Sequence, residues 1–446
     1  MIKYTRFFIT LLLAVSAFAA HSQSTATTSS PYSRYGIGDI DPQLMPQNIG
    51  MGGIGVATNK ISLFNNINIV NPASYGAINL TTIDIGLYSN FLTLSQTGSA
   101  SQKNSNFRLS HLAFAIPVTK RSALSFGLVP YSERGYNYKN TVKGNGAIPA
   151  DTNLTNYTYS GDGGLSKAYF GYGFGIGKHL LIGANVSYIF GTLKDISTTE
   201  INTNINGVIY PLPGTTNSKI ESSNSIAGLN YDYGVQYSVD FSDTKHLTFG
   251  YSGSLNSKLN STSSFIVSQY FNDASGNEDI PLDSVVNKQS SKTKIKLPLT
   301  NRFGISFQSD GKFLVGADYT MSKWSQLSIG GENQGLQDSR TFNIGGQYTP
   351  NIATLRNYLA SVDYRLGAIY DETYMMVNNT RIKRYALTAG VGMPLRPVNG
   401  SFYKINISAE VGRRGSLVNG LVRENYVNIH LGFTLNDKWF QKYKFD

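Results

Sequence analysis

Apolar and polar residues alternate along most of the chain beyond residue 80. In the segment 229–240, apolar side chains occupy every second position and polar side chains occupy the positions between them. The segments 385–393 and 427–436 repeat the same pattern. Successive side chains of a β-strand point to opposite faces, so each segment predicts a strand with one apolar and one polar face.

About fourteen such strands can be placed on the sequence, near residues 80–95, 106–117, 122–136, 165–176, 180–193, 226–240, 245–256, 293–307, 313–323, 340–349, 359–371, 382–394, 402–412 and 425–435. Four connections are short, at 119–121, 177–179, 242–244 and 309–311. They alternate with long ones, at 137–164, 194–225, 257–292 and 324–339. An even number of strands, with short periplasmic turns alternating with long outer loops, is typical of an outer-membrane barrel.

A soluble β-sandwich would also show alternating strands, but three features favour a membrane barrel. Most segments run to ten residues or more, enough for a tilted strand to cross a bilayer. Aromatic residues recur near strand ends, where interfacial girdles lie, and charged residues occur on the polar faces, where a dry core would penalise them. The aromatic residues are Phe190, Tyr251, Tyr319 and Tyr370, and the charged ones are Asp318, Asp363, Arg365 and Glu410.

The first 22 residues have the features of a secretory signal peptide. Lys3 and Arg6 form a basic region, Phe7–Ala20 is apolar, and Ala17-Phe18-Ala19 offers a cleavage site. The chain contains no Cys, which excludes disulfides and lipoprotein acylation, and no later apolar run is long enough for a membrane helix. The sequence therefore predicts an exported protein in the outer membrane of a Gram-negative bacterium.

Charge gives less information about partners. Charged residues make up only 15% of the chain, and the formal net charge is +11. The basic residues are scattered, with no run that would indicate a nucleic-acid partner. General attraction to an anionic surface is the simpler interpretation, so we expect contacts with outer-membrane lipid and lipopolysaccharide.

The stretch 48–84 breaks the alternating pattern. It is glycine-rich at first, with Gly50, Gly52, Gly53 and Gly55, then asparagine-rich, and it is too apolar for a solvated linker. Because the first strand starts at the periplasmic face, this stretch has only the lumen or the periplasm to occupy, and its apolar content favours the lumen. We expect an N-terminal extension and hatch over 23–79, a barrel over 80–436 and a periplasmic tail over 437–446.

With these features the chain resembles the FadL family of outer-membrane transporters for long-chain fatty acids and other hydrophobic molecules. The matching residues are Met51-Gly52-Gly53-Ile54-Gly55-Val56-Ala57, then Asn71-Pro72-Ala73 before the first strand, and 126–131 in the third strand. The resemblance implies a hatch carrying Gly52, Gly53, Asn71, Pro72 and Ala73 inside a fourteen-stranded barrel. Ser74 departs from the glycine usual in that family, and the tail continues past the last strand.

The third strand contains a proline at position 130. Proline removes a hydrogen bond from the strand ladder and is tolerated at an edge or a bulge. In the FadL family a defect in this strand opens the wall sideways, so the resemblance implies a lateral gate at Val129, Pro130 and Tyr131. A bulge without an opening is the alternative.

The long connections carry apolar patches that could bind a hydrophobic ligand or another outer-membrane protein. The alternative is that strands extend above the membrane and these residues pack together. The candidate residues are Ile209, Tyr210, Leu212, Phe265, Ile266, Tyr270, Phe271, Met375 and Met376.

Enzyme motifs do not fit. The segment Gly171–Gly177 resembles a nucleotide-binding loop but has the wrong spacing and no following helix. The five histidines form no pair at metal-ligand spacing, and the sequence lacks a G-x-S-x-G motif. We expect no catalytic residue, no metal and no cofactor.

Two functions stay open at this point. The first is passive uptake of a hydrophobic small molecule such as a fatty acid, captured by the loops and released past the hatch. The second is a non-transporting accessory subunit of an outer-membrane secretion or protein-assembly complex. A transporter should have a continuous apolar pocket from loops to hatch, whereas an accessory subunit should have a filled lumen.

Overall fold

The computed structural model describes residues 28–59, 64–143, 153–205, 208–212, 214–273, 278, 283–354, 356–397 and 400–438. The predicted signal peptide and most of the predicted tail lie outside these residues.

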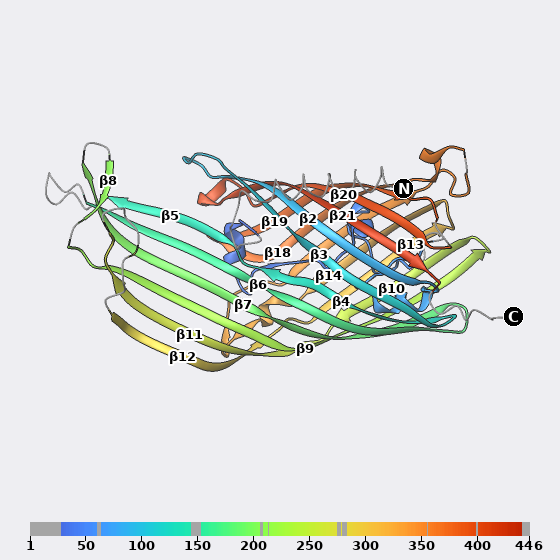
Figure 1. The fold of residues 1–446 in the computed structure, drawn as a ribbon, viewed down its shortest axis with the longest axis horizontal. Coiled ribbons are helices and arrows are strands. Elements are labelled where there is room, and N and C mark those ends of the chain that lie inside the picture. The colour runs from blue at the N-terminus through green and yellow to red at the C-terminus, as the bar shows by residue number, and fades with distance from the viewer. Residues whose placement is uncertain are drawn as a thin grey trace, which may run out of the picture.

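Fourteen antiparallel strands form a closed barrel (Figure 1). Its closure is the pairing of the first wall strand with the last, from Thr81 opposite Asp437 to Ser95 opposite Arg423. The fold class predicted from the alternation is therefore confirmed, and each of the fourteen predicted segments overlaps one wall strand. The wall strands are β2 (Thr81–Ser95), β3 (Gln102–Thr119), β4 (Ser122–Glu133), β6 (Asn153–Ile176), β7 (Leu180–Ile205), β9 (Asn217–Ser242), β10 (Lys245–Ser254), β13 (Thr300–Ser309), β14 (Phe313–Ser322), β17 (Ser339–Tyr348), β18 (Asp363–Val377), β19 (Thr380–Pro394), β20 (Phe402–Arg414) and β21 (Arg423–Asp437).

The two faces of the wall differ as the alternation predicts. In β6, Phe170 and Tyr172 are exposed on the outside, whereas Tyr169, the residue before Phe170, is buried on the inside. Leu366 and Leu387 on β18 and β19 are 70% exposed, as expected for side chains that face lipid. None of the helices in the described residues is long and apolar enough to cross a membrane.

Three of the long connections are largely strand rather than loop. Wall strands β6, β7 and β9 continue far beyond the barrel at one end, and β5 (Tyr136–Lys143), β8 (Val208–Pro211), β11 (Lys258–Tyr270) and β12 (Asp283–Lys296) join them. Together they make a tall sheet on one side of the barrel, at the left in Figure 1, which we call the wing. The opposite end carries the short turns, so we assign it to the periplasm and the wing to the cell exterior.

The fourth long connection is compact. It contains η3 (Trp324–Gln326), β15 (Ser328–Ile329) and β16 (Glu332–Asn333). Two further short 3₁₀ helices, η4 (Tyr358–Ser361) and η5 (Val418–Gly420), lie in other connections.

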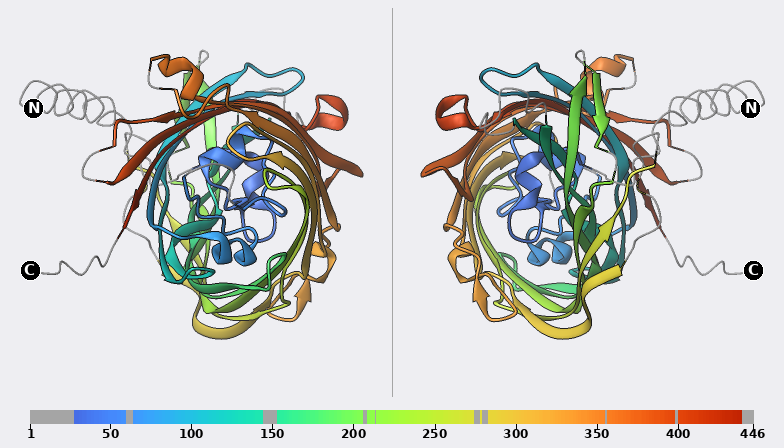
Figure 2. Two further views of the ribbon diagram at one scale, coloured as in Figure 1. Left: turned by 90° about the vertical axis from the view of Figure 1, so that its right-hand side faces the viewer. Right: turned by 90° about the vertical axis from the view of Figure 1, so that its left-hand side faces the viewer.

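The N-terminal segment, residues 28–59 and 64–77, lies inside the barrel (Figure 2). Near the outer end, Ser30 donates a hydrogen bond to Glu424 at the start of β21. Near the periplasmic end, the Asn65 amide donates to Asn436 at the other end of β21. The segment therefore runs the height of the wall before β2 begins. Its elements are η1 (Pro31–Arg34), β1 (Asp39–Ile40), α2 (Pro46–Gly50) and η2 (Pro72–Ala77).

Candidate functional site in the barrel lumen

Inward-facing glycines let the backbone of the N-terminal segment lie directly against the wall. A side-chain carbon at Gly345 would overlap the Met51 carbonyl, and one at Gly367 would overlap the Gly52 amide. Gly183 likewise leaves room for the Pro72 carbonyl. Such close backbone approach is available only to glycine, so these positions fix where the segment can lie.

Hydrogen bonds then join the segment to several wall strands. Asp318 on β14 accepts from the Gly55 and Val56 amides at 2.6 and 2.8 Å. Gln236 on β9 donates to the Val56 carbonyl at 2.9 Å, and Ser306 on β13 donates to the Ala57 carbonyl at 2.7 Å. Buried backbone groups need such partners, because the segment has little secondary structure of its own.

The residues predicted as a hatch motif lie in this contact region. Gly52 and Gly53 adopt left-handed backbone angles of +70° and +81°, which glycine tolerates best. Asn71 caps η2 by accepting from the Ala73 amide at 3.1 Å. The same side chain donates to the Val56 carbonyl at 2.7 Å, so it connects the asparagine-proline turn to the glycine-rich stretch.

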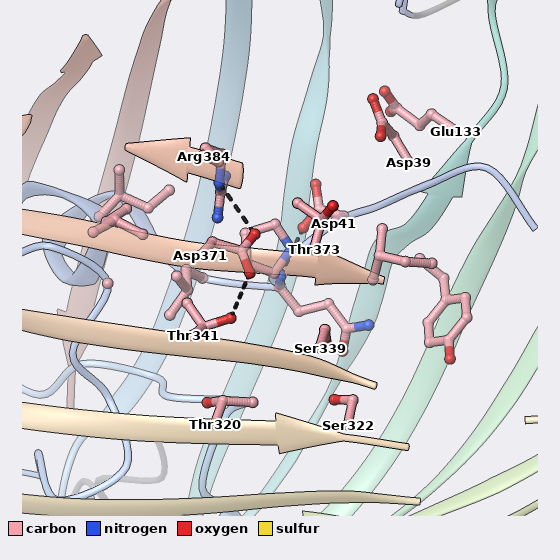
Figure 3. A pocket seen from close by; sticks show the side chains of 18 of the residues that line it. Asp39, Asp41, Glu133, Thr320, Ser322, Ser339, Thr341, Asp371, Thr373 and Arg384 are labelled. Atoms are coloured by element: carbon pink, nitrogen blue, oxygen red, sulfur yellow. Dashed lines mark hydrogen bonds and ion pairs between the residues drawn. The ribbon is translucent and has the colours of Figure 1, made fainter. Parts of the chain in front are cut away.

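A cavity of about 350 Å³ lies between this segment and the surrounding wall strands (Figure 3). Its wall includes hydroxyl groups such as Thr320 and Ser322, and Asp371 is held by Thr341 at 3.0 Å and Arg384 at 3.4 Å. Charged side chains share the remaining lining with apolar ones such as Leu92 and Ile369, so a hydrocarbon in the cavity would lie against charged groups. The charged lining residues are Asp39, Asp41, Arg108, Glu133, Lys167, Arg302, Asp318, Asp371, Arg384, Glu410, Arg414 and Glu424.

An apolar cap closes the outer end of the lumen. Trp324, Leu327 and Leu336 from the compact connection pack with Tyr374 and Met375 of β18 in one buried cluster. Tyr32 of the N-terminal segment joins the cap, and its hydroxyl donates to the Val422 carbonyl at 2.5 Å. Burial raises the pKa of the Tyr32 phenol, which keeps this donor protonated.

The predicted loop-binding residues do not form one site. Met375 and Tyr270 are each 1% exposed, and Met375 belongs to the cap while Tyr270 donates a hydrogen bond to Glu200 in the wing. Ile209, Tyr210, Phe265 and Met376 are exposed, whereas Leu212, Ile266 and Phe271 are partly buried. Extended strands that pack together therefore account for Tyr270, whereas Ile209, Tyr210 and Phe265 stay exposed on the wing.

The wall between β3 and β4 is interrupted near the predicted gate. Pairing of these strands stops at Leu112 opposite Leu128, although both strands continue toward the outer end. Pro130 lies next to a register shift between β4 and β6, as a proline-induced bulge should. The predicted gate residues therefore lie beside the point where the β3–β4 pairing ends.

The N-terminal segment fills this defect. Strand β1 pairs with the free edge of β4, with Asp39 opposite Glu133, and the Asp41 amide donates to the Tyr131 carbonyl at 3.0 Å. Arg108 on β3 completes the seam with ion pairs to Asp41 at 2.7 Å and to Glu133 at 2.6 Å. Figure 3 shows Asp41, Asp39 and Glu133 at this side of the cavity.

Sequence reasoning missed Arg108, Asp41 and Glu133. The alternation in β3 places Arg108 on the polar face, between Phe107 and Leu109, and this was an available signal for a lumenal charge. Its partners lie 67 and 25 residues away along the chain and come together only through β1, whose two residues carry no strand pattern. In the described residues, no group of three His, Cys, Asp or Glu side chains could hold a metal.

This architecture has counterparts among known protein families and solved structures. A family model described as BamG matches residues 1–446. The chain belongs to the BamG family. No curated protein matches the sequence. Similar solved structures cover nearly the whole BamG-family chain but share few of its residues.

Three of these structures define the fold. The toluene transporter TbuX of Ralstonia pickettii is 16% identical, covers 88% of this chain and 98% of its own, and has a TM-score of 0.52. A Pseudomonas aeruginosa FadL homologue is 13% identical, with 90% and 100% coverage and a TM-score of 0.53. The toluene transporter TodX of P. putida is 14% identical, with 89% and 98% coverage and a TM-score of 0.52. The resemblance of this BamG-family chain to FadL-type barrels is therefore confirmed for the fold.

Proposed function

We propose that this chain is a non-transporting accessory subunit of an outer-membrane secretion or protein-assembly complex. The observation that carries this proposal is the charged cavity between the apolar cap and the N-terminal segment. A hydrophobic molecule in that cavity would separate paired charges from water without offering them new partners, which is unfavourable. The mixed lining of this cavity differs from the continuous apolar pocket expected of a hydrophobic-compound transporter.

The attachment of the N-terminal segment supports the same function. Releasing it would break hydrogen bonds to β9, β13 and β14, together with the backbone contacts at Gly345 and Gly367. Each hydrogen bond contributes about 1 kcal/mol net, and more where Asp318 accepts, so opening the lumen would cost a large part of a typical folding free energy. We therefore propose that this segment is a fixed plug.

The wing offers a surface for a partner protein. Ile209, Tyr210, Phe265 and Val285 are between 41% and 65% exposed, although the wing extends beyond the lipid-facing barrel. Exposed apolar side chains outside the membrane commonly mark interaction sites. Docking of another outer-membrane protein on the wing would give the extended strands a role that transport does not require.

An uptake assay in lipid vesicles tests this proposal. Vesicles carrying the purified protein should take up labelled toluene and a labelled fatty acid no faster than protein-free vesicles. Vesicles carrying TodX, which is a toluene transporter, are the positive control. Uptake of either compound at a rate similar to that in the control would overturn the proposal.

Passive uptake of a hydrophobic small molecule is the second candidate, favoured by the gap between β3 and β4 and by the transporters among the similar structures. In this function, β1 would move away from the edge of β4 to open the gap. A disulfide engineered between Ile40 and Ser132, which lie opposite each other in the ladder, would hold it closed. The chain has no other cysteine to interfere. Uptake that disappears on oxidation and returns on reduction would favour this candidate.

A further inference from the structure

Four lysines gather on the hairpin formed by β11 and β12. Lys258 lies directly opposite Lys296 in the strand ladder, Lys294 lies opposite Asn260, and Lys292 opposite Thr262. Residues paired across an antiparallel ladder lie on the same face of the sheet. The four amino groups therefore share one face of the hairpin.

That face continues the lipid-facing side of the barrel. Leu259 and Ile295, which alternate with the lysines, are buried in the apolar cap on the inner side. Asn260 pairs with Ala227, two residues beyond the exposed Leu229 on the same face of β9. The lysines consequently lie just outside the last lipid-facing residues of this side, at the level of lipid headgroups.

Among the residues that the structure describes, no acidic side chain forms an ion pair with this cluster. None of the ion pairs among the described residues involves Lys258, Lys292, Lys294 or Lys296. The nearby carboxylate of Glu221 already pairs with Lys194 at 2.6 Å. Like charges directly opposite each other in a sheet are destabilising. An anion from outside the chain would therefore relieve the repulsion between Lys258 and Lys296.

We propose that this hairpin binds the phosphate groups of an outer-leaflet glycolipid such as lipopolysaccharide. Juxtamembrane lysines are attracted to anionic headgroups, and lysine is a common phosphate ligand. Protection of a free strand edge does not account for all four lysines, because β12 pairs with β15 at Lys296 and the Gly330 amide donates to the Lys294 carbonyl. The proposal rests on the membrane orientation of the barrel and holds whether or not the protein transports a ligand.

The test compares two full-length variants of equal charge in detergent. One replaces Lys258, Lys292, Lys294 and Lys296 by Gln, and the other replaces Lys120, Lys178, Lys245 and Lys312, which are exposed at the periplasmic turns. The probes are phosphorylated lipid A and the same lipid with its phosphates removed. We expect phosphorylated lipid A to bind the first variant at least about tenfold more weakly than the wild type, since each juxtamembrane lysine contributes about 1 kcal/mol. The periplasmic variant should stay within about twofold of the wild type.

Three outcomes would overturn the proposal. One is unchanged affinity of the hairpin variant for phosphorylated lipid A, with circular dichroism showing an intact barrel. Another is equal binding of the dephosphorylated lipid by the wild type. The third is displacement of lipid A by an equal concentration of inorganic phosphate, which would identify a general anion site. If the hairpin variant binds lipid A normally but no longer copurifies with an acidic protein, the first outcome has occurred. The lysines would then bind a protein partner instead of a lipid.

Discussion

Replacing Asp363 by Ala should lower the free energy of unfolding by about 3–5 kcal/mol, the largest loss expected from a single substitution in this protein. Asp363 accepts from Lys404 at 2.7 Å, from Arg365 at 2.8 Å and from Thr349 at 2.7 Å. The side chains of Asp363, Arg365 and Lys404 are each at most 3% exposed. Removing the carboxylate leaves two buried cations without their anion, and their desolvation is then uncompensated.

Urea unfolding in detergent, followed by circular dichroism, measures this effect. Asp243→Ala, in an exposed periplasmic turn, is the matched control and should change stability by less than about 0.5 kcal/mol. Replacing Asp363, Arg365 and Lys404 together by apolar residues of similar size should recover much of the loss, because no unpaired charge remains. An Asp363→Ala protein as stable as the control would show that water reaches this cluster.

A double Gly345→Val, Gly367→Val variant should fail to seat the N-terminal segment. Each valine would meet the backbone at Met51 or Gly52, which cannot move aside as a flexible side chain could. Overpacking typically costs about 1–3 kcal/mol per site, and the hydrogen bonds of the displaced segment would be lost in addition. Limited proteolysis should then cut within residues 28–59 while the wall stays intact.

Ala368→Val is the control for this variant. Its side chain lies on the outer face of β18, two positions from the exposed Leu366, so the added methyl groups face lipid. The segment should stay protected from protease in this protein. If residues 28–59 are equally protected from protease in the double glycine variant, the plug is not held by close backbone contact at Gly345 and Gly367. The wall would then have space for both valine side chains.

The wall was predictable because it depends on a local pattern. Alternation over ten residues identifies a strand, and the predicted segment 425–435 lies within two positions of β21 at both ends. The segment 226–240 ends within two positions of the end of β9 but begins nine residues after its start. Strands beyond the membrane were only the alternative interpretation of the long connections, because Ser, Thr and Asn dominate both faces of the wing strands and give no alternation. Residues 194–205 look like a loop for this reason, yet they continue β7.

The contacts that close the lumen depend on residues far apart in the sequence. Asp318 meets the Gly55 amide across 263 positions, and Ser408 meets the Pro46 carbonyl across 362. The polar face of a strand shows that a charge points inward, but its partner depends on the register of other strands and on the path of the plug. Sequence alone could therefore predict a plug and inward charges, but not that the charges line the cavity between plug and cap.

Purification of the native protein in mild detergent, followed by mass spectrometry of both proteins and lipids, tests the central claim most directly. The account predicts a stoichiometric partner protein from the outer membrane, together with headgroup-bound glycolipid but no hydrophobic molecule retained in the lumen. A protein that purifies alone and carries a fatty acid or another hydrophobic compound in stoichiometric amount would contradict it.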